Sequence, residues 1–414
     1  MLAFVLCAVL ATQQQSIVPQ YFPRLFPQPT GNNGFEEYVL ADDLRRELGI
    51  ESYFSDDDLE QGKTWFELAR AQAAGSSRVL ALVKQGNAKP VHNPFLDHAR
   101  LAVEDPAMVG AAGALKIYGT YLFAVGQAQR GVDVSETLSD MGVKLAHAGG
   151  FMSYLNGVRF SRYGDLLLYD NLKMAPLSDL QRIAGRGTWD MRVGLVKEVD
   201  RDLEYLAKNC DAMRADPEGL ARGHFNTFYA CSFWDWANLS DGDWQTVRAD
   251  LLASVARARL VLQRYVDLPF GDVLGDLDSN FPTDEEIDDE AKMDLWELLE
   301  FPHRLLVSAV LKNTQQQLLR LHVNIEVHRR LHGRLPISLG ELEDKEAAAD
   351  PLSGTDFIYH VAERRYRLFS SGGATTGAIT MRTRLKPMSR ELTEPDPPSP
   401  SSSSTTSATP PGTP

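Results

Sequence analysis

Apolar residues recur every three or four positions through most of the chain from residue 36 to residue 331. This is the spacing of one buried helix face. It predicts a series of helices, at 36–48, 107–131, 133–150, 152–174, 189–213, 244–266 and 290–331. Short Gly- or Pro-containing breaks join successive helices into hairpins. We therefore expect a mainly α fold, with helical hairpins arranged as a bundle or a short solenoid.

The clearest predicted hairpin covers residues 107–150. Gly131 is expected to end its first helix. Asp133 and Glu136 have the spacing of a capping box, so they are expected to begin the second helix.

A different pattern follows the last long helix. Gly333 is expected to end that helix, and Pro336 prevents it from restarting. Residues 357–361 and 365–369 are rich in β-branched and aromatic side chains and are separated by three residues. We expect a small C-terminal module made of a long helix and a β-hairpin.

This C-terminal block resembles the soluble module of the major pseudopilins of type II secretion. The shared elements are a His-rich helix end at 328–332, a Gly-Arg-Leu-Pro stop at 333–336, an acidic turn at 339–342, an Asp-Pro turn at 350–354 and a Tyr-containing hairpin at 357–371. The whole layout also looks like the large uncharacterised envelope proteins of planctomycete-type bacteria, which is a likeness of architecture.

The sequence departs from the pseudopilin pattern in two places. The pseudopilin assembly helix is N-terminal and hydrophobic, whereas this helix is internal and carries Lys312 and glutamines at 315–317. The acidic calcium loop of that family is replaced by residues 372–377, which include no carboxylate. The resemblance therefore implies neither pilus assembly nor calcium binding here.

The two ends of the chain differ in composition from the middle. An apolar run at 2–10 with small residues near 9–11 resembles a secretory signal peptide, and it is shorter than the ~20 apolar residues that span a bilayer. The final residues are mostly Pro, Ser and Thr, a composition typical of disorder. The expected divisions are a signal-like segment (1–15), an extended lead-in (16–34), a helical domain (35–266), an acidic linker (267–289), the C-terminal module (290–390) and a disordered tail (391–414).

The overall charge makes some classes of binding partner less favourable than others. The net charge is −14, which disfavours binding to nucleic acid. No stretch after the signal-like segment is long and apolar enough to span a membrane. We expect an exported protein of the periplasm or cell envelope that binds another protein.

The sequence leaves the state of two cysteines open. Cys210 and Cys231 either form a disulfide or remain buried thiols.

Two patterns superficially suggest metal binding. His328 and His332 have the spacing of two zinc ligands on a helix, but Arg329 stands where a zinc protease has its general-base Glu. Asp276, Asp278 and Asn280 begin like an EF-hand loop, but bulky residues take the positions that require Gly and a bidentate Glu. We therefore expect no metal and no cofactor.

Two groups of residues are candidates for a binding site. His322, Glu326 and Arg329 share the polar stripe of the long helix, where side-chain pairs on a solvated or groove-facing surface are the alternative. Trp234 and Trp236 belong to an aromatic cluster at 225–236, for which a place in the core is the alternative.

No sequence motif identifies a catalytic residue, so the first hypothesis is a non-enzymatic scaffold of the cell envelope. The alternative is an envelope hydrolase or a carbohydrate-binding protein that uses the aromatic cluster at 225–236. A pseudopilus-associated component is a third hypothesis.

Overall fold

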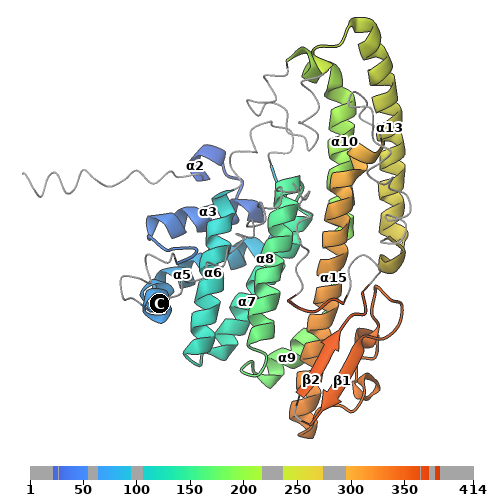
Figure 1. Ribbon diagram of the computed structural model, residues 1–414. Coiled ribbons are helices and arrows are strands. Elements are labelled where there is room, and N and C mark those ends of the chain that lie inside the picture. Colours follow the sequence, from blue (N-terminus) through green and yellow to red (C-terminus); the bar gives the residue numbers. More distant parts are fainter. Residues whose placement is uncertain are drawn as a thin grey trace, which may run out of the picture. The chain divides into compact units, whose positions relative to one another are not determined.

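The computed structural model describes residues 22–26, 28–54, 64–94, 106–216, 236–273, 295–363, 365–372 and 378–382. Within these ranges the chain is mainly α-helical, with a two-stranded antiparallel sheet near the C-terminus (Figure 1). The predicted fold class is confirmed. The signal-like segment, most of the acidic linker and the C-terminal tail lie outside the described residues.

The first helices pack against one another. They are α2 (Phe22–Leu25), α3 (Gly34–Glu47), α5 (Trp65–Asn87), α6 (Pro106–Ala124), α7 (Ala128–Ala146) and α8 (Phe151–Asp170). Helix α3 packs on α5 and α6, and α7 packs on α6 and most extensively on α8. A capping box between Thr64 and Glu67 begins α5.

The later elements gather around one long helix. They are α9 (Leu177–Ala184), α10 (Met191–Ala215), α13 (Asp241–Asp267), α15 (Leu295–His332), the short 3₁₀ helices η4 (Leu339–Glu341) and η5 (Glu346–Ala348), and the strands β1 (Ile358–Ala362) and β2 (Arg365–Phe369). Helix α15 contacts α8, α9, α10 and α13, and it carries the hairpin at its C-terminal end (Figure 1).

The turn between α6 and α7 lies earlier in the chain than predicted. It falls at residues 125–127, where Gly126 has a positive φ of 77° that favours glycine. Gly131 is inside α7, against the ring of Phe123, so the predicted stop is wrong. The predicted capping box is also wrong, because Asp133 and Glu136 lie within α7.

Glycines allow α7 and α8 to pack at backbone contact distance. A Cβ added at Gly142 would lie 2.5 Å from the carbonyl oxygen of Gly157, and one added at Gly157 would lie 2.6 Å from that of Gly142. Backbone atoms of two packed helices cannot move apart cheaply. The missing side chains therefore fix how closely these two helices approach.

Replacing Gly142 with alanine is expected to lower the free energy of unfolding by about 2 kcal/mol, because overpacking typically costs this much. Gly185 is the matched control, since its backbone is unstrained and the nearest atom to an added Cβ is 3.8 Å away. Denaturant unfolding of Gly142→Ala and Gly185→Ala measures both changes. Equal stability of the two variants would contradict the close packing.

A run of polar residues in the middle of α15, at 312–317, connects it to distant parts of the chain. Lys312, Asn313, Thr314 and Gln315 are buried, and a buried polar group requires a partner. Their partners include Asp165 for Lys312, Asp190 and Met191 for Asn313, Val310 for Thr314, Arg162, Thr380 and Met381 for Gln315, Ser161 and Trp189 for Gln316, and Glu346 for Gln317.

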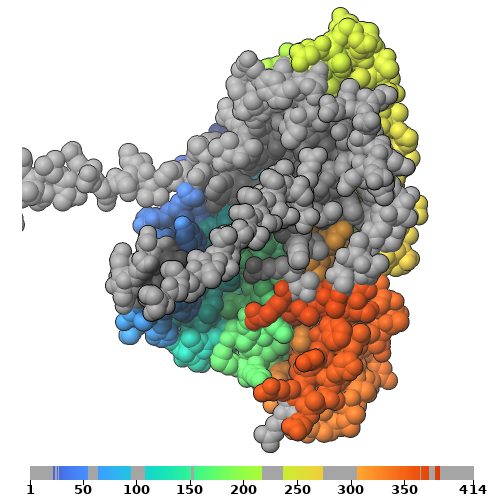
Figure 2. Space-filling view, in the orientation of Figure 1, coloured from blue at the N-terminus to red at the C-terminus, as the bar shows by residue number. Residues whose placement is uncertain are grey.

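The C-terminal hairpin has the predicted position. Strands β1 and β2 pair in register from Ile358 with Phe369 to Ala362 with Arg365. The hydroxyl of Tyr359 donates to the carbonyl of Pro336, 2.8 Å away, and so joins β1 to the turn after α15. Figure 2 shows this module (orange and red) in contact with the green helical region around α9.

Two further predictions concern the membrane and the cysteines. None of the described helices combines the length and apolarity that crossing a bilayer requires. Cys210 is a free, buried thiol, and Cys231 lies outside the described residues.

Candidate functional site: a polar pocket between α7, α8 and α15

A half-open pocket of about 100 Å³ lies where α7, α8, the segment after α9 and α15 meet. Its polar lining includes Asp140 from α7, Asp165 from α8, Arg186 and Thr188 from the segment after α9, and Gln316 from α15. The elements come from parts of the chain that are far apart in sequence, so the fold itself builds the pocket.

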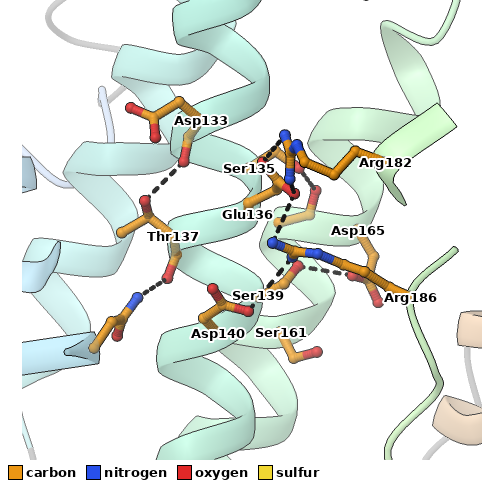
Figure 3. Close-up of polar contacts among 12 residues, drawn as sticks. Asp133, Ser135, Glu136, Thr137, Ser139, Asp140, Ser161, Asp165, Arg182 and Arg186 are labelled. Atoms are coloured by element: carbon orange, nitrogen blue, oxygen red, sulfur yellow. Dashed lines mark hydrogen bonds and ion pairs between the residues drawn. The ribbon is translucent and has the colours of Figure 1, made fainter. Parts of the chain in front are cut away.

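The α7 wall of the pocket is made of ion pairs. Arg182 binds Glu136 with two nitrogens, at 2.5 and 2.7 Å. Arg186 extends between two carboxylates, 3.0 Å from Glu136 and 3.7 Å from Asp140 (Figure 3). Burial raises the pKa of Asp140, and the charge of Arg186 opposes that rise. Two arginines thus pair with Glu136, whereas Asp140 has only the more distant contact with Arg186 and can still accept hydrogen bonds.

The α8 wall of the pocket contains a buried ion pair. Asp165 accepts a hydrogen bond from the hydroxyl of Ser139 at 2.8 Å (Figure 3) and binds the ammonium of Lys312 through its other oxygen. The Lys312 side chain is only 3% exposed. Burial lowers the pKa of Lys312, and Asp165 opposes this shift by favouring the charged form.

The rim of the pocket carries an aromatic side chain. Trp189 lines the pocket and is 56% exposed. Its backbone N–H donates to the side chain of Gln316, 3.2 Å away, which holds the rim segment against α15. Within the described residues, the backbone N–H groups of Gly187 and Thr188 donate to no backbone carbonyl, and both residues are exposed. These donors are therefore available to a bound molecule.

The arrangement suits binding better than nucleophilic catalysis. A serine nucleophile needs a general base within hydrogen-bond reach. The acceptor beside Ser139 is Asp165, whose other carboxylate oxygen is already paired with the ammonium of Lys312. Ser135 donates to the carbonyl of Gly164 at 2.7 Å, so its hydroxyl is held by the backbone.

In the predicted stripe, His322 and Glu326 are buried, whereas the side chain of Arg329 is 42% exposed. His322 is 6% exposed, between Tyr169 of α8 and the Tyr366 hydroxyl 2.8 Å away. Burial lowers the pKa of His322 to about 3, so the ring is neutral at pH 7. The stripe holds the hairpin and α8 against α15 and lies apart from the residues that line the pocket.

Glu326 forms the side-chain pairs that its spacing suggested. It accepts hydrogen bonds from Arg329 at 2.6 and 2.8 Å and from Arg330 at 2.8 Å. Burial alone would raise the pKa of Glu326, but these hydrogen bonds lower it overall. The carboxylate is thus ionised and fully engaged.

Trp236 lies in the hydrophobic core. It is 2% exposed, and its ring centroid is 5.2 Å from that of Trp244. A ligand in solvent cannot reach it without opening the core. Trp234 and the rest of the aromatic cluster lie outside the described residues.

His328 and His332 lie together at the end of α15, with ring centroids 4.3 Å apart. The Nε2 atom of His328 is 3.7 Å from Glu341, and Arg334 donates to the same carboxylate at 2.8 Å. Among the described residues, no group of three or more His, Cys, Asp or Glu side chains is placed to hold a metal ion. The EF-hand-like segment lies outside the described ranges.

The pocket residues were not among the sequence candidates. Ser139, Asp140 and Asp165 are spaced like the solvated face of an amphipathic helix, and no motif joins them to Arg186 or Lys312. The one available signal was Trp189, a large aromatic residue at a predicted helix start in a polar context.

Comparison with known proteins adds no further assignment. No protein-family model matches the sequence, and no match is found among curated proteins or among solved structures.

Proposed function

We propose that this protein is a non-catalytic scaffold of the cell envelope that binds another protein. The observation that supports it is a set of exposed apolar side chains around the C-terminal end of α15. This set, which we call the α15 end surface, consists of Met174, Leu331 and Ile337.

Hydrogen bonds and chain position place these three residues near the same end of α15. Arg330 of α15 donates to the backbone carbonyls of Leu172, Lys173 and Ala175, so the turn that carries Met174 is fixed beside the last turn of the helix. Leu331 is the next residue of α15, and Ile337, which is 71% exposed, follows the Gly333–Pro336 turn.

Exposed large apolar side chains cost free energy in water, and their clustering is typical of a protein–protein interface. Arg330 precedes Leu331 and Arg334 lies three residues before Ile337, and arginine is enriched in protein–protein interfaces. The signal-like N-terminus and the pseudopilin-like layout of the C-terminal module support an envelope setting. The neutralised carboxylates of the pocket support a role without catalysis.

A photo-crosslinking amino acid placed at Met174 tests the proposal in the producing cell. We expect one discrete protein adduct, and we expect the second-site change Ile337→Asp to reduce its yield about tenfold, the effect of ~1.4 kcal/mol lost at an apolar interface. Leu260 on α13 is also 71% exposed, so it provides a matched control both as a crosslinking site and as Leu260→Asp. Equal adducts from both sites, or turnover of a substrate by the purified protein, would contradict the proposal.

A further inference from the structure

We propose that the pocket between α7, α8 and α15 binds a neutral, hydroxyl-rich molecule, such as a monosaccharide or a small polyol. This inference concerns a different surface from the α15 end surface. It is tested by different residues, so either proposal can fail alone.

The charges of the pocket exclude a strongly charged ligand. Each lining carboxylate lies against a cation within the protein: Glu136 against Arg182 and Arg186, Asp140 against Arg186, and Asp165 against Lys312. The remaining lining cation, Arg320, is paired with Asp344 at 2.5 Å. An added anion or cation would face a group of like charge without a free counter-charge, and a desolvated charge without a partner is costly.

The free hydrogen-bonding groups of the pocket are mixed. Asp140 offers an acceptor, whereas the N–H groups of Gly187 and Thr188 offer donors. The Thr188 hydroxyl both donates and accepts. A ligand hydroxyl also does both, so a molecule with several hydroxyls satisfies this set without carrying charge.

Trp189 provides the apolar part of the site. Because it lines the pocket and remains 56% exposed, part of its ring is open to solvent at the rim. One face of a sugar ring presents C–H bonds, which pack against an aromatic ring, while the hydroxyls at its edge form hydrogen bonds. The buried lining residues Val143, Leu168 and Leu319 add apolar surface to the pocket.

The pocket size favours a small ligand. The pocket volume of about 100 Å³ is smaller than an engineered cavity of about 150 Å³ that holds one benzene molecule. A short polyol fits within that space, and a hexose would fill it and extend to Trp189. A larger molecule would project into solvent, so a terminal sugar of a longer glycan and a free sugar share the same chemistry.

Calorimetric titration of the full chain with glucose, galactose, mannose and glycerol tests the proposal. At least one of these probes should bind saturably, with a Kd of about 1 mM, the order expected for a ligand of this size. Glucose 6-phosphate and glucosamine carry a charge and should bind at least about tenfold more weakly than the neutral probe. A methyl glycoside of the binding sugar distinguishes a glycan end, which it resembles, from a free sugar.

Variants of Trp189 separate a binding role from a structural one. Trp189→Ala should weaken binding of the neutral probe about tenfold or more, whereas Trp189→Phe retains a ring and should bind within about twofold of the original chain. Asp140→Asn should also weaken binding. Tyr53→Ala, which removes another highly exposed aromatic side chain, serves as the control with unchanged binding. Failure of all neutral probes to bind, stronger binding of a charged analogue, or equal binding by Trp189→Ala would overturn the proposal.

Discussion

Replacing Lys312 with methionine is expected to lower the free energy of unfolding by about 3–5 kcal/mol, the cost of leaving one member of a buried ion pair without its partner. The change leaves the Asp165 carboxylate inside the protein with the hydroxyl of Ser139 and no counter-ion. Denaturant unfolding of the purified variant, followed by far-UV circular dichroism, measures the change.

Two controls show whether the ion pair causes this loss. The double variant Lys312→Met/Asp165→Leu removes both charges and should recover most of the stability, because an apolar pair of similar volume often replaces a buried ion pair without loss. Lys84→Met breaks the Lys84–Asp133 pair, in which both side chains are more than two-fifths exposed, and should cost at most about 1 kcal/mol. A double variant as unstable as Lys312→Met would show that packing and not charge is responsible.

Lowering the pH from 7 to 4 is expected to remove about 3 kcal/mol of stability through His322 alone. Burial lowers the pKa of His322 to about 3 in the folded protein, against 6.5 for an ordinary histidine. Below about pH 6.5, His322 therefore binds a proton in the unfolded chain but remains neutral in the folded protein. Stability is complete above pH 6.5 and falls as the pH drops toward 3, by about 1.4 kcal/mol for each pH unit.

The variant His322→Phe should flatten this part of the pH dependence. It removes the titrating group, and its cost at neutral pH comes from the lost hydrogen bond to Tyr366. The measurement is the free energy of unfolding from pH 4 to pH 7 for both proteins. Leu321→Ala removes a neighbouring buried side chain that does not titrate, so it should lower stability equally at each pH. A pH dependence unchanged by His322→Phe would refute the assignment.

Periodicity predicted most of the described helices because their buried faces are apolar over several turns. The hairpin of β1 and β2 was predicted for a similar reason, since its β-branched and aromatic residues cluster in two short runs. These are local signals, and each is contained within one element.

The turn at Gly126 was missed because two glycines compete for the role and only one has a positive φ. Position 131 requires a small residue for a different reason, because the ring of Phe123 lies against it. Sequence alone does not distinguish a glycine that ends a helix from one that lets a helix pack closely. The deciding contact is tertiary.

The pocket could not be predicted because its important pairs are separated by long stretches of chain. Lys312 resembled a polar interruption of an apolar helix, and Asp165 resembled a residue of a solvated face. Their contact requires α8 and α15 to be adjacent, and nothing in the local pattern specifies that. The sequence likewise could not decide between a solvated and a groove-facing position for His322, since the residues that cover it come from α8 and β2.

The ion pair between α8 and α15 also determines the order in which the chain can mature on the ribosome. Lys312 follows Asp165 by 147 residues, so at about 5–20 residues per second it is synthesised roughly 7–30 s later. During that interval the Asp165 carboxylate of the newly made α7–α8 hairpin has no Lys312 to pair with and remains hydrated. We therefore expect burial of this carboxylate, and covering of this face of α8, to wait for translation of α15.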